Sequence, residues 1–366
     1  MGNVPNLRFP EFCGEWVTKS INDLAVVIGG GTPDTTVKSY WDGEIQWFTP
    51  SEIGKNKYVD SSLRTITEVG LNNSSAKLLP PNTILLSSRA TIGECSLSLR
   101  ECATNQGFQC LVSKKCNVDF LYYLIQTKKK DLIRKSCGST FLEISANEVR
   151  KIQVSVPSDV EQQKIAELLS LIDERIATQN KIIEKYESLI RGIAQNMVHR
   201  GKPNVRLSDC MICNSSTLQE SEVLESGTYP VYGANGIVGY LDCYATLNEA
   251  IYIIKDGSGV GTVFYVAGKC SAAGTLNTLQ AKEGYSLQYL YYLLTVFNFE
   301  PYKTGMAIPH IYFKDYGKAK VFCPSHSEQF KYTKLLSTID SKLLAEQNAL
   351  VNYNLQKQYL LRQMFI

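Results

Sequence analysis

The chain has 366 residues, 44% of them hydrophobic and 20% charged, which predicts a packed fold of about two or three domains and argues against disorder. The formal net charge of +3 is only mildly basic, so it neither demands nor excludes nucleic acid as a partner. The first residues lack a secretory pattern, and the apolar runs are too short to span a bilayer. We therefore expect a cytoplasmic protein with no membrane partner.

Two mixed regions, residues 15–155 and 203–322, alternate short apolar runs with turns rich in Gly, Pro and Asn. The runs TILLSS at 83–88 and AIYIIK at 250–255 have the length and composition of buried strands. A short helix is expected at 119–134, ending in the basic run that starts at Lys128. The pattern predicts an α+β fold with a strong β component in each region.

A long helix is predicted after each mixed region, because apolar residues recur there at steps of three and four. The first seam comprises Leu169, Ile172, Ile176, Ile183, Tyr186, Ile190, Ile193 and Met197. The second comprises Leu336, Ile339, Leu343, Leu350, Tyr353, Leu360 and Met364. Ser158 with Glu161, and Ser325 with Glu328, fit capping boxes at the helix starts. Each helix should have about 38 residues and a length of roughly 57 Å.

The chain is an internal repeat with an offset of 167 residues. Between positions 157 and 197, 12 of 41 residues are identical to their counterparts, among them the pairs Gln162/Gln329 and Asp173/Asp340. The two seams share a polar interruption, at Gln179 and Glu346. Matched seams favour pairing of the helices with each other, in antiparallel orientation, over packing of each helix on its own domain alone.

Catalytic and metal-binding motifs are missing from the sequence. The one Pro-Pro pair, at residues 80–81, lacks the flanking residues of an adenine methyltransferase motif, and the glycine loop at 257–261 is better explained as a hairpin turn. Cys210 and Cys213 have C-x-x-C spacing, but there is no second pair, so we expect core packing rather than a metal site. No catalytic triad, metal site or cofactor site is predicted for this chain.

Loop residues that could contact DNA combine amides, hydroxyls, basic groups and aromatic rings. In the first mixed region these candidates are Thr32, Lys38, Tyr40, Trp41, Gln46, Lys55, Lys57, Arg89, Asn105 and Gln106. In the second they are Tyr232, Asn235, Lys255, Ser258, Asn277 and His310. A core role for the aromatic residues and a solvated position for the lysines remain alternatives, and His310 could be a DNA contact or simply structural.

Several segments resemble the specificity subunits of type I restriction-modification systems. LRFPEF at 7–12 with Trp16 is similar to the opening of that family, and residues 30–54 resemble its first recognition motif. SSRATIG at 87–93, ATNQGF at 103–108 and the helix start at 157–176 resemble further family segments. The second half carries weaker versions, including GSGVGT and TGMAIPHI, and Lys357 replaces the seam residue Ile190. Phe330 and Tyr332 likewise replace Gln163 and Ile165 near the start of the second helix. Together, these replacements lead us to expect a weaker grip of the second helix on its partner.

The resemblance implies two target-recognition domains, residues 1–156 and 201–323, each followed by a spacer helix, residues 157–200 and 324–366. Each domain would read one half of a bipartite site in double-stranded DNA, and the helices would set the gap. Glu161, Gln162, Glu328 and Gln329 would join the seam residues in the spacer and partner interface. Two methyltransferase subunits would be the partners, and the resemblance leaves open whether two motor-nuclease subunits join.

The resemblance also implies that S-adenosylmethionine, Mg²⁺ and ATP bind only to the partner subunits, and that this chain is not an enzyme. Two alternatives are a self-sufficient DNA methyltransferase and a coiled-coil scaffold that does not bind DNA. The missing methyltransferase motifs count against the first alternative, and the second predicts no sequence preference in DNA binding at any salt concentration.

Overall fold

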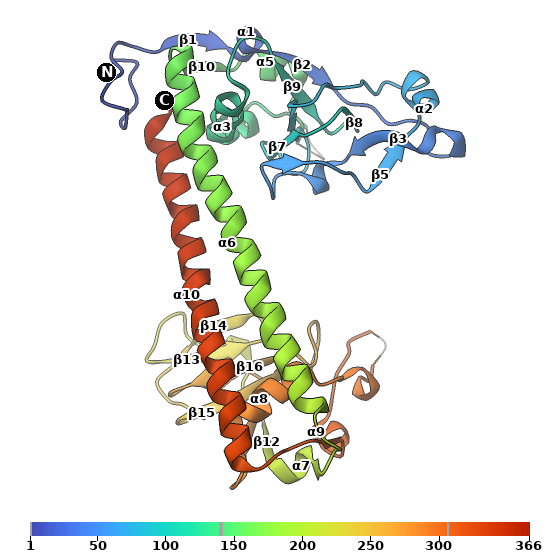
Figure 1. The fold of residues 1–366 in the computed structure, drawn as a ribbon, viewed down its shortest axis with the longest axis vertical. Helices are drawn as coiled ribbons and strands as arrows, with labels where there is room; N and C mark the ends of the chain where they lie inside the picture. Colours follow the sequence, from blue (N-terminus) through green and yellow to red (C-terminus); the bar gives the residue numbers. More distant parts are fainter. Residues whose placement is uncertain (1, 139–141, 306) are drawn as a thin grey trace. The chain divides into compact units, whose positions relative to one another are not determined.

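The computed structural model describes residues 2–138, 142–305 and 307–366, which form two compact units (Figure 1). Unit 1 comprises residues 1–179 and 349–366, and unit 2 comprises residues 180–348. The two long helices, α6 (Asp159–His199) and α10 (His326–Met364), each contribute one part to either unit. Among the described residues, no helix is long and apolar enough to cross a membrane.

Unit 1 is built on small sheets, as the alternation of apolar runs and turns predicts. A five-stranded sheet has the order β2 (Ala25–Gly29), β9 (Gln109–Ser113), β6 (Ile84–Leu86), β7 (Cys95–Ser98) and β4 (Tyr58–Val59). A three-stranded sheet has the order β5 (Arg64–Ile66), β3 (Trp41–Phe48) and β8 (Cys102–Thr104), and β1 (Val17–Ser20) pairs with β10 (Gln153–Val156). Strands β3 and β8 run parallel, so the loops that follow them lie at the same edge of the sheet.

Short helices cover the sheets of unit 1: α1 (Ile21–Leu24), η1 (Lys38–Tyr40), η2 (Pro50–Glu52), α2 (Glu68–Asn72), α3 (Val118–Thr127), α4 (Lys129–Arg134) and α5 (Ala146–Arg150). The single helix expected at 119–134 is wrong, because two helices meet at Lys128. Lys128 has φ −92° and ψ 8°, and its N–H bonds to the carbonyl of Ile125, which tightens the last turn of α3. The bend lets α4 bury Leu132 completely.

Unit 2 repeats this plan with shorter connections. Its strands are β11 (Val205–Arg206), β12 (Met211–Ser215), β13 (Tyr229–Gly233), β14 (Gly236–Leu241), β15 (Glu249–Ile254), β16 (Val263–Ala267), β17 (Ser271–Ala272), β18 (Leu276–Ala281) and β19 (Lys320–Val321). They form sheets of order β12-β18-β15-β16, β14-β13-β17 and β11-β19. The helical segments are α7 (Leu207–Cys210), η3 (Glu220–Glu222), α8 (Leu287–Thr295), η4 (Glu300–Tyr302) and α9 (Phe313–Tyr316).

The internal repeat is visible in the structure as well as in the sequence. INDLAVV at 21–27 and LSDCMIC at 207–213 both form a one-turn helix followed directly by a strand, α1–β2 and α7–β12. Cys210 is fully buried and Cys213 packs against the core of unit 2, as expected. The glycine loop at 257–261 connects the antiparallel strands β15 and β16, which confirms a hairpin turn. Its counterpart places Ala90 at φ 54° where the second repeat has Gly257 at φ 89°.

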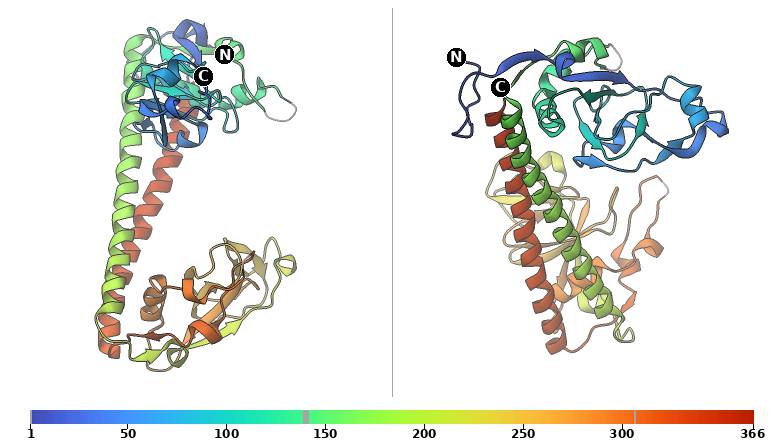
Figure 2. Two further views of the ribbon diagram at one scale, coloured as in Figure 1. Left: turned by 90° about the vertical axis from the view of Figure 1, so that its right-hand side faces the viewer. Right: turned by 45° about the horizontal axis from the view of Figure 1, so that its top comes forward.

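The two long helices run antiparallel within each unit. In unit 1 the first part of α6 and the last part of α10 lie side by side, with Asp173 next to Lys357 and Arg175 next to Tyr353 (Figures 1 and 2). In unit 2 the end of α6 packs on the start of α10, with Arg200 donating to the Tyr332 hydroxyl. The helices have 41 and 39 residues, or roughly 60 Å each at about 1.5 Å per residue.

Buried seam residues join each helix end to the core of its unit. Leu169 and Ile172 of α6 share one hydrophobic cluster with Leu360 and Met364 of α10 in unit 1. In unit 2, Leu336 of α10 shares a cluster with Met197 of α6 and helix α8. The apolar residues of the expected seam are therefore buried or half-buried, and each mixed region is packed on helix segments from both α6 and α10.

Candidate nucleic-acid interface

Four polar candidates of the first region come together at the edge where β3 and β8 end. Thr32 donates its hydroxyl to the side-chain carbonyl of Gln106, and the Asn105 side chain accepts from Gly107 N at 2.8 Å. The strand end that carries Arg89 is joined to this loop, because Ser88 N donates to Gly107 O at 2.8 Å. Gln106 is exposed and Arg89 is 42% exposed, so this cluster presents donors and acceptors to solvent.

The second region has an equivalent cluster. Lys255 N donates to Thr275 O at 2.9 Å, and Ile311 N donates to Lys255 O at 2.9 Å, which brings His310 beside the β15 end. The Lys255 ammonium lies 3.4 Å from Ser216 O, and the ring centroid of His310 lies 5.2 Å from that of Tyr312. Asn235 and Ser258 are exposed on neighbouring turns. Met306, within the motif that contains His310, lies outside the described residues.

Several candidates are core residues and do not face solvent. Trp41 is 7% exposed, lies 5.1 Å from Trp47 in a T-shaped contact, and packs with Tyr40. Asn277 is 4% exposed and accepts from the Ser215 hydroxyl at 2.7 Å. These positions hold the scaffold of the loops, since large rings and buried amides stabilise by packing and internal hydrogen bonds.

Gln46 and Tyr232 are also engaged internally. The Gln46 side-chain carbonyl accepts from Ser62 N at 2.7 Å. Tyr232 contacts the Tyr252 ring at 5.9 Å, and burial raises the pKa of its hydroxyl. Tyr232 occupies a place like that of the buried Phe48, because it pairs with Ala272 in the parallel β13–β17 ladder as Phe48 pairs with Thr104 in the parallel β3–β8 ladder. Neither side chain is therefore a natural candidate for reading a base.

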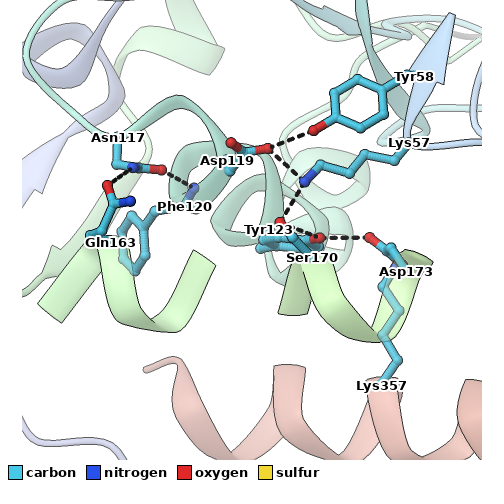
Figure 3. A network of polar contacts seen from close by, with 10 residues as sticks. All are labelled: Lys57, Tyr58, Asn117, Asp119, Phe120, Tyr123, Gln163, Ser170, Asp173 and Lys357. Carbon is cyan, nitrogen blue, oxygen red and sulfur yellow. Dashed lines mark hydrogen bonds and ion pairs between the residues drawn. The ribbon is translucent and has the colours of Figure 1, made fainter. Parts of the chain in front are cut away.

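Lys57 was a candidate because of its charge, but its side chain is buried in a network of polar contacts (Figure 3). Its side chain is only 6% exposed, and its ammonium lies 2.6 Å from Asp119 and donates to the Ser170 hydroxyl at 2.7 Å. The ammonium also lies 5.0 Å from the ring centroid of Tyr123. A buried, paired lysine fixes the segment before β4 to α3 and α6, so Lys57 has a structural role in this arrangement, and its predicted contact to DNA would require this pairing to break. Lys38 and Lys55 remain exposed.

The spacer residues predicted as an interface attach the helices to their own units. Gln162 donates to Pro157 O at 3.0 Å and accepts from Asn117 N, the N-cap of α3, at 3.0 Å. Gln329 repeats this clamp, donating to Pro324 O and accepting from Ser286 N, the N-cap of α8, each at 2.9 Å. Both glutamines are buried, at 3% and 2% exposure.

The residues at the two capping positions behave differently from each other. Ser158 accepts from Glu161 N at 3.4 Å, but the Glu161 carboxylate accepts from Arg8 at 2.8 Å and from the Trp16 indole at 3.3 Å. That carboxylate raises the pKa of the Arg8 guanidinium, chiefly through the hydrogen bond. Glu328 is exposed instead, so the two ends of the repeat present different surfaces.

Comparison with known proteins places this arrangement in a family. The model of the type I restriction modification DNA specificity domain matches residues 14–188 and again residues 202–353. The chain belongs to this family. The name of the family refers to specificity for DNA and not to a reaction. The two matched segments correspond to the two copies of the repeat.

Relatives in the specificity-subunit family cover different shares of the chain. The MjaIX specificity subunit of Methanocaldococcus jannaschii is 40% identical over 179 residues, which are 47% of this chain and 41% of that protein. The EcoprrI specificity subunit of Escherichia coli is 25% identical over 344 residues, 85% of this chain and 84% of that protein. The chain thus spans less than half of the first relative and most of the second.

A solved structure shows the same fold. The S subunit of the type I restriction-modification system of M. genitalium aligns over 99% of both chains with a TM-score of 0.64 and 19% identity. Within the described residues of this family member, no group of three or more His, Cys, Asp or Glu side chains is placed to hold a metal ion.

A tyrosine–aspartate contact joins each recognition region of the specificity subunit to its helix. Tyr123 donates to Asp173 at 2.6 Å, and Tyr292 donates to Asp340 in the second repeat. Burial raises the pKa of both tyrosine hydroxyls, so they stay protonated and act as donors. Burial also raises the pKa of the Asp340 carboxyl above its ordinary value.

Sequence reasoning missed these contact residues, together with Asp119, Ser170 and Glu143. FLYYLI at 120–125 resembles YLYYLL at 289–294, and Asp173 is identical to its counterpart Asp340. Combining the two similarities would have paired the tyrosines with the aspartates. Arg64, whose guanidinium lies 3.5 Å from the ring centroid of Trp41, carries no signal in the sequence.

Proposed function

We propose that this chain selects the DNA target of a type I restriction-modification complex and has no catalytic centre of its own. Each recognition domain, residues 1–156 and 201–323, reads one half of a bipartite, non-palindromic site. The observation that carries this proposal is the pair of equivalent loop clusters. The same backbone hydrogen bonds, from Ser88 N to Gly107 O and from Lys255 N to Thr275 O, support different side chains in the two repeats. A backbone that is the same in both repeats but carries different exposed side chains is suited to reading two different half-sites.

The contacts to DNA fall into two classes in this proposal. Arg89, Asn105, Gln106, Ser258 and Asn235 supply groups for base edges, because they lie on the loops with exposed or half-exposed side chains. Lys38 and Lys55, together with Thr32, supply contacts to phosphate and sugar. The buried residues Trp41, Lys57 and Asn277 hold the loops in place and do not touch DNA.

The spacer helices, residues 157–200 and 324–366, act as the ruler between the half-sites. The glutamine clamps and the tyrosine–aspartate contacts support this role, since they fix each domain to its helix segments. The outer faces of the helices recruit two methyltransferase subunits, which bind S-adenosylmethionine. A solved structure that describes complex assembly of the type I R-M system aligns over 95% of this chain with a TM-score of 0.57 and 14% identity, and this likeness supports the recruitment of partner subunits.

A domain exchange tests the proposal. Residues 15–155 are replaced by the equivalent segment of another family member, and the methylated sequence is mapped in cells that carry the methyltransferase partner. One half of the methylated site should change while the other half and the gap stay the same. A change in both halves would contradict modular reading, and methyl transfer by the purified chain without its partner would contradict the non-catalytic assignment.

A further inference from the structure

Among the isolated β-bridges beside the loop clusters, one occurs at equivalent positions of the two repeats with side chains of opposite chemistry. In the first repeat the bridge joins Arg89 to Glu143, and in the second it joins Asp256 to His310. All four positions are related by the offset of 167 residues. A cation opposite an anion in one repeat thus becomes an anion opposite an imidazole in the other, on an unchanged backbone.

This reversal differs from what the repeat does where a contact is structural. The tyrosine–aspartate contacts and the glutamine clamps keep the same residue types in both repeats, because the fold needs the same hydrogen bonds. The bridge keeps only its backbone. Arg89 and Glu143 are 42% and 35% exposed, so their chemistry is not dictated by a buried core. At this bridge the two repeats therefore differ in the hydrogen-bonding groups that their side chains present to solvent.

The first repeat presents hydrogen-bond donors at the bridge. Arg89 Nη2 lies 2.8 Å from a carboxylate oxygen of Glu143, which orients the guanidinium while leaving most of its five N–H groups available. The planar fork of an arginine matches O6 and N7 of guanine in the major groove, a pairing that lysine or asparagine does not reproduce.

The second repeat presents acceptors at the same place. His310 Nδ1 lies 3.1 Å from Ile308 O, and since a carbonyl can only accept, Nδ1 carries the proton of the neutral ring. Nε2 is then an acceptor, and the Asp256 carboxylate is one as well. Acceptors match the exocyclic amino groups of cytosine or adenine in the major groove.

At this same point, each repeat has a buried hydroxyl without a hydrogen-bond partner among the described residues; elsewhere in the second repeat the Tyr316 hydroxyl is another. The hydroxyls at this point belong to Ser88, next to Arg89, and to Thr275. Ser88 and Thr275 lie on opposite sides of the equivalent backbone pairing, Ser88 N to Gly107 O and Lys255 N to Thr275 O. A buried hydroxyl costs free energy unless it is paired, so both point to a polar ligand at this edge.

We infer that the pair Arg89/Glu143 and the pair Asp256/His310 are the positions at which the two domains read different base pairs. The inference rests on the proposed function, and it assigns a guanine contact to the first domain and an amino-group contact, to cytosine or adenine, to the second. The two half-sites differ at this position because the bridge reverses its donors and acceptors.

Exchange of the pairs in the full chain tests this assignment. The variants Arg89→Asp/Glu143→His and Asp256→Arg/His310→Glu are each combined with the methyltransferase partner, and the methylated sequences are mapped. The first variant should lose the guanine preference at one position of one half-site, and the second should gain one in the other half-site. The change in preference should be roughly 5- to 150-fold, the range for one bidentate base contact.

The ion pair between Lys129 and Glu94 supplies a matched control, because its side chains are 46% and 38% exposed on the same β6–β7 hairpin and the neighbouring α4. Lys129→Glu/Glu94→Lys should leave the methylated sequence unchanged. An unchanged sequence in the bridge variants, or weaker methylation of the same sequence at wild-type melting temperature, would overturn the inference. A wild-type complex that methylates without a bipartite sequence preference would instead overturn the proposed function.

Discussion

Asp173 and Asp340 occupy equivalent positions of the repeat but contact different neighbouring residues. Each accepts a hydrogen bond from a tyrosine, but Asp173 also pairs with Lys357 at 2.7 Å, with both side chains less than one-fifth exposed (Figure 3). The counterpart of Lys357 beside Asp340 is Ile190. Burial raises the pKa of Asp340, with the Tyr292 hydrogen bond only partly offsetting it.

The variants Asp173→Asn and Asp340→Asn should therefore have different effects on the stability of the fold. Asp173→Asn leaves Lys357 buried without its carboxylate, which should lower the free energy of unfolding by about 3 kcal/mol. Asp340→Asn keeps an acceptor for Tyr292 and removes a poorly solvated charge, so the melting temperature at pH 7 should stay or rise. Thermal unfolding of both variants checks this, and equal destabilisation would show that the two sites are energetically alike.

The pH dependence of Asp340 follows from the direction of its pKa. Because the folded-state pKa lies above the unfolded value, proton binding at Asp340 stabilises the fold fully below about pH 4, and this contribution disappears as pH rises through the folded pKa. Any advantage of Asp340→Asn at pH 7 should therefore shrink as the pH is lowered toward 4. An advantage that grows on acidification would contradict the burial argument.

At the scale of the elements, Lys357 has a partner in the seam, because its ammonium pairs with Asp173. The weaker grip of the second helix that its replacement of Ile190 led us to expect stays a prediction. In unit 2, a hollow of about 250 Å³ is lined by Ile190, Asp340, Arg191 and residues of α8, so we expect the looser packing to lie there. The sequence could not reveal the pairing of Lys357, since the partner of a seam lysine depends on the helix opposite.

Exchange of these two residues should move the stabilisation from one unit to the other. Lys357→Ile should reduce amide hydrogen-exchange protection in α3, because Asp173 loses its cation, and Ile190→Lys should increase protection in α8, because Asp340 gains one. The matched control is Lys342→Ile, an exposed lysine on α10 that should change stability by no more than about 0.5 kcal/mol. No difference between Lys357→Ile and this control would argue against the pairing.

Elements whose pattern is local could be predicted from sequence, and elements fixed by tertiary contacts could not. The apolar period gave both long helices, and the alternation of apolar runs and turns gave β6 and β15. The break at Lys128 was missed because nothing local opposes a helix there; burial of Leu132 decides it. Among the candidate site residues, Lys57 and Asn277 have the right chemistry for DNA but lie inside. The type of a residue shows whether its side chain could bind DNA, whereas only the fold decides whether that side chain is exposed.

At the scale of the whole molecule, the proposed ruler can be lengthened without breaking the seams. Inserting one heptad in both helices, after Gln179 and after Gln347 near the unit boundaries, preserves the heptad register and adds about 10 Å at roughly 1.5 Å per residue. The gap in the methylated site should grow by about three base pairs of roughly 3.4 Å. As a control, the insertion in α6 alone should shift one seam against the other and lower stability. An unchanged gap in the doubly extended chain would refute the ruler.

The composition of unit 1 has a consequence for how the chain is made. Leu360, Met364 and Phe365 belong to the same core as Trp16 and Phe120, so segments far apart in the sequence complete one another. Because translation proceeds from the N-terminal side, unit 2, residues 180–348, is synthesised before the segment of α10 that completes the core of unit 1. Translation that stops before Leu360 therefore yields a chain in which unit 2 has all of its residues and the core of unit 1 does not.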